Sequence, residues 1–189
     1  MLSIKERQTY LKHLGFYQGN IDGIVGPKTK TAYKSLQKTF FIREKDIDGI
    51  YGKNTDILLQ NAYNVSVYCK NFTLKEFRCG CGGKHCTGYP EVLDVDLLKD
   101  LQTIRDRYGA TTVTSGLRCT KHNSLVGGVS GSRHKNGKAV DITNATSKTE
   151  SGRTAIMNLF KTLPQARYTY CNIKGSNPNM GTAVHIDVI

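Results

Sequence analysis

Long hydrophobic runs are absent from this sequence of 189 residues. No stretch approaches the roughly 18 consecutive apolar residues of a membrane-spanning helix, so we expect no membrane insertion. The first ten residues, MLSIKERQTY, also lack the apolar core of a secretory signal peptide. We therefore expect synthesis in the cytoplasm without a signal peptide, and release to any outside target by another route.

Acidic residues are scarce, with 15 Asp and Glu against 27 Lys and Arg and a formal net charge of +12. The basic residues are scattered and form no long block, which indicates a broadly cationic surface that suits a polyanion. Nucleic acid, anionic lipid and an acidic wall polymer all fit that description. Aromatic residues interleaved with Lys and Arg, or a recognised zinc finger, are not present, so a nucleic-acid partner is the least favoured of these.

The first third of the chain contains an internal repeat. IDGIVGPKT, residues 21–29, returns as IDGIYGKNT, residues 47–55. Each Asp-Gly pair predicts a turn, and each final Thr would cap or open the helix that follows. Apolar residues at helical spacing predict helices over 4–15, 28–40 and 55–65. We expect an all-α module of three helices.

The pattern Gln–x–x–Leu–x–x–Leu–Gly–Phe–Tyr, followed by the first Asp-Gly repeat, begins at Gln8. It resembles the three-helix peptidoglycan-binding domain found on many cell-wall hydrolases, over residues 4–62. The resemblance implies a peptidoglycan-binding domain at 1–65, against the alternative of a generic helical module. Tyr17, Asp22 and Tyr51 lie near the turns and are candidate glycan contacts.

The second unit, residues 72–189, mixes helices and strands. Helices are predicted over 90–109 and 151–163, and strands over 110–118 and 166–173. No regular β-α-β repeat is present, so the class is α+β with a small antiparallel sheet. The junction at 64–71 lacks a Pro, Gly or Ser-rich linker, which predicts close packing of the two units.

Two short segments alternate between apolar residues and metal-ligand types. His134 precedes a strand that carries Asp141, and the terminal strand carries His185. If these strands pair side by side, about 4.8 Å apart, both ligand faces open to one cleft. A hydrolytic zinc site needs three such ligands and an open position for water. Taken singly, each histidine could be structural and the aspartate could cap a turn.

The combination Ser–x–His–x–x–Gly–x–Ala–x–Asp is met by Ser132, His134, Gly137, Ala139 and Asp141. It resembles the zinc D-Ala-D-Ala carboxypeptidase family, which includes vancomycin-resistance dipeptidases and several phage endolysins. SGLRCTKHN upstream and VHIDV downstream extend the resemblance over 72–189. The resemblance implies zinc bound by His134, Asp141 and His185.

The resemblance also implies that Arg118 binds a substrate carboxylate or carbonyl and that Ser132 hydrogen-bonds substrate. Better-known members place an acidic catalytic base three positions before the last ligand, where this chain has Thr182. Asp187, on the same strand face as His185, is the predicted base, with orientation of a ligand histidine as its alternative role. His122 is the second candidate, and it could instead fix its loop.

Six cysteines are present. Cys79, Cys81 and Cys86 could bind a second, structural zinc ion with Cys119 or His85 as fourth ligand. The spacing is not that of a common zinc finger, so buried thiols or a disulfide are alternatives. Cys69 and Cys171 are isolated residues.

Together these observations predict a monomeric zinc metallopeptidase that docks on bacterial peptidoglycan and cuts a stem or cross-link peptide bond with zinc-activated water. The absent signal peptide favours a phage-type endolysin. D,D-carboxypeptidase and endopeptidase activities stay open. The main alternative is a non-catalytic cell-wall-binding protein whose peptidase unit is degenerate, because Thr182 cannot serve as a base.

Overall fold

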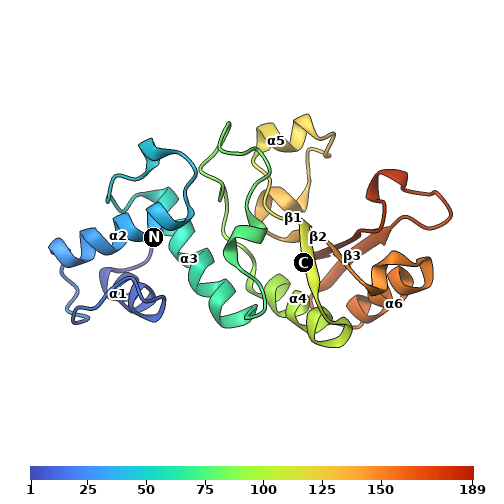
Figure 1. The fold of residues 1–189 in the computed structure, drawn as a ribbon, viewed down its shortest axis with the longest axis horizontal. Coiled ribbons are helices and arrows are strands. Elements are labelled where there is room, and N and C mark those ends of the chain that lie inside the picture. Colours follow the sequence, from blue (N-terminus) through green and yellow to red (C-terminus); the bar gives the residue numbers. More distant parts are fainter.

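The computed structural model describes residues 1–189 and has two parts that lie end to end (Figure 1). The N-terminal module consists of α1 (Ile4–His13), α2 (Pro27–Phe40) and α3 (Lys53–Tyr68), which confirms the predicted three helices. No helix in the structure combines the length and the apolar character needed to cross a lipid bilayer.

A buried glutamine organises each repeated turn of this module. The side chain of Gln37 is enclosed, and its Nε2 donates to Asp48, Thr55 and the carbonyl of Ile50, while its Oε1 accepts from the Gly49 amide. Buried polar groups are costly unless paired, so this one amide satisfies and fixes the whole turn.

Gln8 does the same for the first turn. Its Nε2 donates to Asp22 and to the carbonyl of Ile24, and its Oε1 accepts from the Gly23 amide. The repeat in the sequence is therefore a repeat of one hydrogen-bonding device, with Gln8 on α1 and Gln37 on α2.

Thr29 and Thr55 open their helices but do not cap them. The N-caps of α2 and α3 are Gly26 and Gly52, and each threonine lies in the first turn of its helix. The hydroxyls of Thr29 and Thr55 bond back to the carbonyls at the turn. Each threonine hydroxyl also accepts a hydrogen bond from the buried glutamine of its turn, Thr29 from Gln8 and Thr55 from Gln37.

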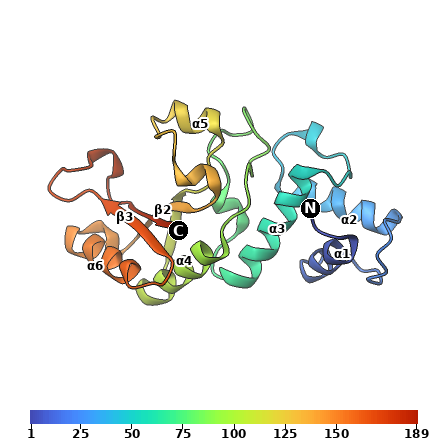
Figure 2. The same ribbon diagram turned by 180° about the vertical axis from the view of Figure 1, so that it is seen from behind.

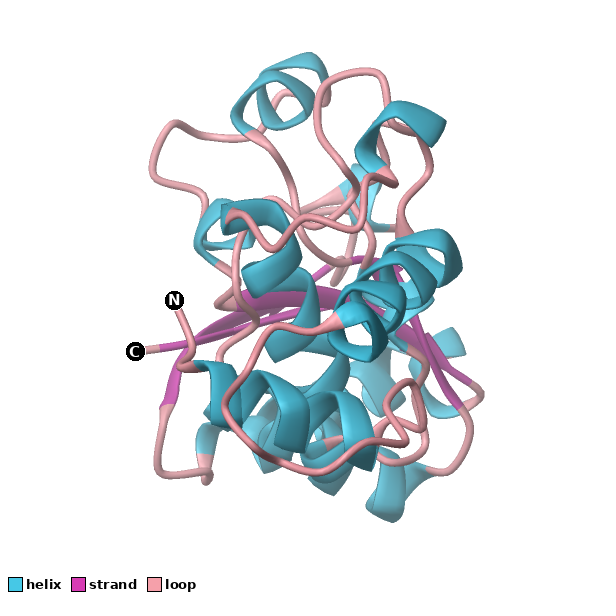
Figure 3. Ribbon diagram, turned by 90° about the vertical axis from the view of Figure 1, so that its left-hand side faces the viewer, coloured by secondary structure: helices cyan, strands magenta, loops and turns pink.

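The C-terminal domain is α+β, as predicted. Its four-stranded antiparallel sheet has the order β1-β2-β4-β3. Figure 3 shows the strands crossing the middle of the molecule with helices above and below them. The elements are α4 (Val95–Tyr108), β1 (Thr111–Ser115), α5 (Thr120–Leu125), β2 (Ala139–Asn144), α6 (Glu150–Lys161), β3 (Ala166–Cys171) and β4 (Val184–Val188). Short 3-10 helices lie at Glu44–Asp46, Leu74–Phe77, Arg133–Asn136, Thr146–Lys148 and Pro178–Met180.

Two predicted elements start or end elsewhere. The helix expected over 90–109 begins at Val95, because Asp94 caps it by accepting from the Asp96 amide. The strand expected over 110–118 ends at Ser115, because the Leu117 amide turns away from the sheet to bond the carbonyl of Phe77.

The two parts pack closely, as the junction predicts. One apolar core of 30 buried residues runs from the module into the domain. α3 contacts α4, and the two lie side by side when seen from behind (Figure 2). The amide side chain of Asn61 on α3 also binds the carbonyl of Glu91 and the amide of Leu93. The third helix runs past the predicted boundary at residue 65.

Replacing Gln37, the buried glutamine of the second turn, tests its role in stability. We expect Gln37→Ala to lower the free energy of unfolding by about 1–3 kcal/mol, because the turn's buried groups lose their partner. Gln18→Ala, at an exposed position, is the matched control and should change it by less than about 0.5 kcal/mol. Urea unfolding followed by circular dichroism measures both. Equal stabilities for the two variants would contradict the role assigned to Gln37.

Candidate metal centre

The sheet register places one row of polar residues side by side. Asp141 on β2 lies directly opposite His185 on β4. Beyond them, Ser115 pairs with Asp141 at the end of β1, and Tyr170 on β3 pairs with His185. Paired residues share a face of the sheet, so the row spans all four strands. The opposite face is apolar and forms part of the core.

His134 reaches this row from a tight loop. It lies in the 3-10 helix Arg133–Asn136, which ends at Gly137 with φ of 70°. A β-carbon on Gly137 would collide with the carbonyl of Val92, so only glycine allows the chain to turn back here. The Nδ1 of His134 donates to the carbonyl of Gly116 at 2.8 Å, which leaves Nε2 free to face the sheet.

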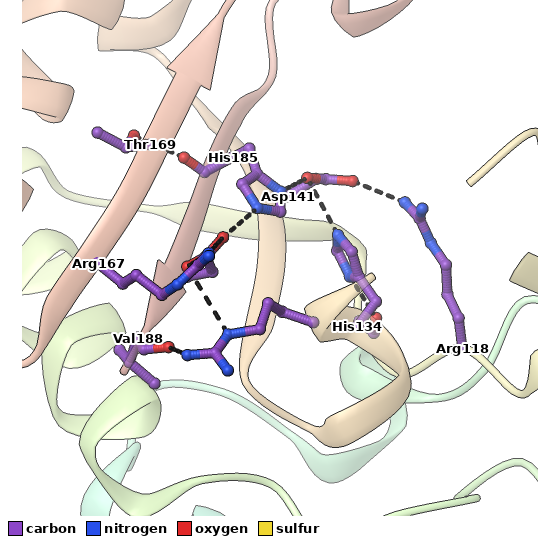
Figure 4. Close-up of polar contacts among 10 residues, drawn as sticks. Arg118, His134, Asp141, Arg167, Thr169, His185 and Val188 are labelled. Atoms are coloured by element: carbon purple, nitrogen blue, oxygen red, sulfur yellow. Dashed lines mark hydrogen bonds and ion pairs between the residues drawn. The ribbon is translucent and has the colours of Figure 1, made fainter. Parts of the chain in front are cut away.

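The three predicted ligands converge. Nε2 of His134 lies 3.4 Å from Oδ1 of Asp141, and Nδ1 of His185 lies 2.8 Å from the same oxygen. All three ligand atoms lie within 4.8 Å of one another. The residues are only 3%, 8% and 6% exposed, and Figure 4 shows the two rings turned toward the carboxylate. Two imidazoles and a carboxylate are the donor set of hydrolytic zinc sites.

The Asp141 carboxylate is held in its charged form. Burial alone would raise the pKa of Asp141, but hydrogen bonds and charge from His134 and His185 outweigh it and keep the pKa below its ordinary value. Its second oxygen, Oδ2, accepts from Arg118 at 2.9 Å (Figure 4). One oxygen therefore faces the histidines and the other faces a guanidinium.

Asp187 sits behind His185. Its Oδ2 lies 3.2 Å from Nε2 of His185, and Oδ1 accepts from Arg167 at 3.2 Å. Arg133 lies 4.0 Å away on another side. The residue is 3% exposed, so its carboxylate is enclosed by one imidazole and two guanidinium groups.

The other predicted residues are less closely joined to the three predicted ligands. Arg118 is tied to Asp141 and to the hydroxyl of Ser115. Ser132 precedes the 3-10 helix, and its side chain makes no cap bond. The ring of His122 lies against Gly80, away from the three ligands.

Tyr170 is not among the site residues predicted from the sequence. Its ring stacks on His185 with centroids 4.6 Å apart and planes at 29°. Burial and the nearby Asp141 charge raise the pKa of its hydroxyl. Tyr168, next along the same strand face, is 55% exposed. The alternation in RYTYC indicated a strand, but only the pairing of β3 with β4 brings Tyr170 to the site.

A second cluster forms from cysteines. The Sγ atoms of Cys79, Cys81, Cys86 and Cys119 lie within 4.8 Å of one another. Cys119 is therefore the residue that joins the predicted three, whereas His85 is exposed and stands apart. Cys69 and Cys171 are buried elsewhere as single thiols.

Comparison with known proteins agrees with both parts of the fold. The peptidoglycan binding domain family matches residues 2–56. A spore cortex-lytic enzyme of Oceanobacillus iheyensis is 35% identical over 83 residues, which cover 44% of this chain and 28% of that protein.

The zinc D-Ala-D-Ala carboxypeptidase of Streptomyces albus G is 34% identical over 128 residues, or 65% of this chain and 49% of that protein. The chain thus spans half or less of the length of these curated relatives. The family described as peptidase M15 matches residues 70–171, which contain His134, Asp141 and the cysteine cluster. With more than half of its length matched, the chain belongs to the peptidase M15 family.

Proposed function

We propose that this protein is a zinc-dependent peptidase that hydrolyses a peptide bond in bacterial peptidoglycan while its N-terminal module docks on the same polymer. The observation that carries the proposal is the convergence of His134, Asp141 and His185 in a chain that also matches a peptidoglycan-binding family. The role of the zinc D-Ala-D-Ala carboxypeptidase it resembles supports the substrate class.

His134, Asp141 and His185 would hold the ion. Bound there, zinc would supply an activated water and polarise the scissile carbonyl. The chain's own residues prepare the site. The carbonyl of Gly116 holds the proton of His134 on Nδ1, and Arg118 keeps one oxygen of Asp141 away from the histidines.

Asp187 is better suited to positioning than to the role of base predicted from the sequence. Its carboxylate faces Nε2 of His185 and is engaged by Arg167. A carboxylate behind a ligand histidine fixes the tautomer and orientation of the ring. We propose that Asp187 holds the proton on Nε2 so that Nδ1 is free to bind metal.

Arg118 also has two candidate roles, which are to orient Asp141 and to bind substrate. Its guanidinium bonds Ser115 and Asp141, yet its side chain remains 17% exposed. The structure supports a role in orienting Asp141, while contact of Arg118 with substrate stays a prediction. Tyr170 and Tyr168 lie on the more open side of the row, where a substrate chain could rest against their rings.

The non-catalytic alternative has one observation in its favour. Asp141 and Asp187 are the only carboxylates that contact the two histidines, and both are engaged by arginines. Thr182 stands where better-known relatives carry an acid. A wall-binding protein without activity would show this arrangement too, so the two functions must be separated by experiment.

For the module, we propose wall docking at a hollow of about 670 Å³ between α1, α2 and the second turn. Tyr51, Ile50 and Lys34 line it, and Arg7 stacks on the Tyr51 ring at 3.9 Å. Tyr17, another predicted contact, is buried with its hydroxyl bonded to the carbonyl of Asn20. The cationic surface favours an anionic wall. Release as an endolysin stays a prediction.

Hydrolysis of purified peptidoglycan tests the proposed activity. Mass spectrometry should detect new muropeptides with the native protein, and a chelator should abolish them until zinc is restored. Asp141→Ala should slow their formation about a thousand-fold, because loss of the ion removes several kcal/mol of transition-state stabilisation. Binding to walls with no products under any of these conditions would establish the non-catalytic alternative.

Asp187→Asn tests the positioning role. We expect zinc affinity to fall about 10- to 100-fold, with hydrolysis largely restored at saturating zinc. Competition with a fluorescent chelator measures the affinity, and Asp106→Asn on the exposed face of α4 is the matched control. Unchanged affinity together with lost hydrolysis at saturating zinc would instead make Asp187 the base.

The two copies of the repeated turn offer a matched pair of variants for testing wall binding. Ile50 and Ile24 occupy equivalent turns and are both 66% exposed, but only Ile50 lines the hollow. We expect Ile50→Asp to weaken co-sedimentation with peptidoglycan at least about tenfold, a loss of about 1.4 kcal/mol. Ile24→Asp should bind as the native protein does. Equal losses, or none, would place the docking surface elsewhere.

A further inference from the structure

We propose that Cys79, Cys81, Cys86 and Cys119 bind a structural zinc ion separate from the centre at Asp141. The four residues come from two segments about 40 positions apart, namely the loop 79–88 and the start of α5. No disulfide is formed by any cysteine of the chain.

The spacing of the sulfurs suits one ion better than a disulfide. Zinc binds thiolates at about 2.3 Å, so a tetrahedral site places its sulfurs about 3.8 Å apart. Here the Cys81 and Cys86 sulfurs lie 3.5 Å apart, and all four lie within 4.8 Å. A disulfide needs about 2.05 Å and joins only two of them. Four thiols around one point are the donor set of structural zinc sites.

Backbone amides donate hydrogen bonds to two of the sulfurs, as backbone amides do to metal-bound thiolates. The Cys119 amide donates to Sγ of Cys79 at 3.3 Å, and the His122 amide donates to Sγ of Cys119 at 3.4 Å. Such bonds stabilise negative charge on sulfur. The loop is closed by the Cys79 amide on the carbonyl of Gly88, so the cluster is held by the fold itself.

The choice of ion follows from the donors. All four are soft sulfur ligands with no carboxylate among them, which excludes calcium and magnesium sites and favours zinc or iron–sulfur centres. A cluster of four sulfurs drawn this closely around one point suits a single ion. We therefore propose zinc, and finding iron in the cluster would contradict this proposal.

The site would join three parts of the molecule. The loop packs Gly83 and Gly88 against Ile42 of the N-terminal module. Its other side is tied to the chain that leaves β1, where the Leu117 amide bonds the carbonyl of Phe77. Cys119 follows Arg118 directly, and Arg118 holds Asp141. An ion here would fix the loop and the segment that carries Arg118 to each other.

The test measures metal directly. Native protein, prepared with reductant and zinc, should contain two zinc ions per chain by plasma mass spectrometry. Asp141→Ala should retain one, and Cys81→Ser/Cys86→Ser should also retain one. Cys69→Ser and Cys171→Ser are matched controls at buried thiols outside the cluster and should retain two.

Three further measurements do not require that variants of the cysteine cluster fold. Cobalt-loaded native protein should show thiolate-to-cobalt charge-transfer absorption. Denaturing the metal-free native protein in iodoacetamide should add six carbamidomethyl groups, one for each thiol. For Asp141→Ala, strong chelation should lower the melting temperature by about 10 °C or more, since structural zinc contributes folding energy.

The outcomes separate this inference from the proposed function. Zinc retained by Asp141→Ala supports the thiolate site whether or not the native protein cuts peptidoglycan. One zinc in the native protein that is lost from Asp141→Ala would overturn the thiolate site and leave the peptidase proposal intact. Iron in the cluster, or fewer than six alkylated thiols, would overturn it as well.

Discussion

A buried carboxylate sets the arrangement of the C-terminal domain. Asp141 lies on β2 between the buried apolar residues Val140 and Ile142, and an unpaired charge there would be strongly destabilising. It is stabilised because His134, His185 and Arg118 all face it. These contacts hold only in one register of β2 and β4, since a slip by one residue would turn every side chain to the other face. The same register keeps the apolar positions of both strands against the core, so hydrophobic burial and the polar row enforce the same pairing.

The N-terminal module is also organised by buried polar side chains, but these are neutral amides. Gln8 and Gln37 are enclosed amides whose donors and acceptors are all taken by their turns. Fully satisfied buried polar groups specify one conformation, whereas half-satisfied ones are costly. In both parts of the chain, then, enclosed polar side chains fix loops that could otherwise adopt many shapes. The continuous apolar core supplies stability between them, and Asn61 binds the backbone of the junction.

Much of the fold and of the candidate site was predictable where a local sequence pattern decides the structure. Strict alternation around Asp141 and His185 indicated two strands with one polar face, and the family resemblance of the Ser-x-His motif implied His134 as the third candidate ligand. The sequence could not reveal which arginines surround Asp187, because Arg133 and Arg167 come from different elements that only the sheet order brings together. Tyr170 was missed for the same reason. The start of α4 was misplaced because Asp94 caps the helix there and the side chain of Asn61, from the distant α3, binds the backbone just before the cap. Local periodicity predicts elements, but the partners of a buried charge depend on topology.

Arg118 links the two clusters through one residue. Its side chain bonds Asp141, its amide bonds the carbonyl of His134, and the next residue is Cys119. The backbone before it is held against Phe77, where a β-carbon on Gly116 would collide. A guanidinium loses much side-chain entropy when it is fixed, so its anchor must be rigid to make the contact favourable. The segment runs from the end of β1 to the start of α5, and Cys119 of the thiol cluster is the N-cap of that helix. An ion at the proposed thiolate site would hold Cys119, and with it the end of the segment that carries Arg118 onto Asp141.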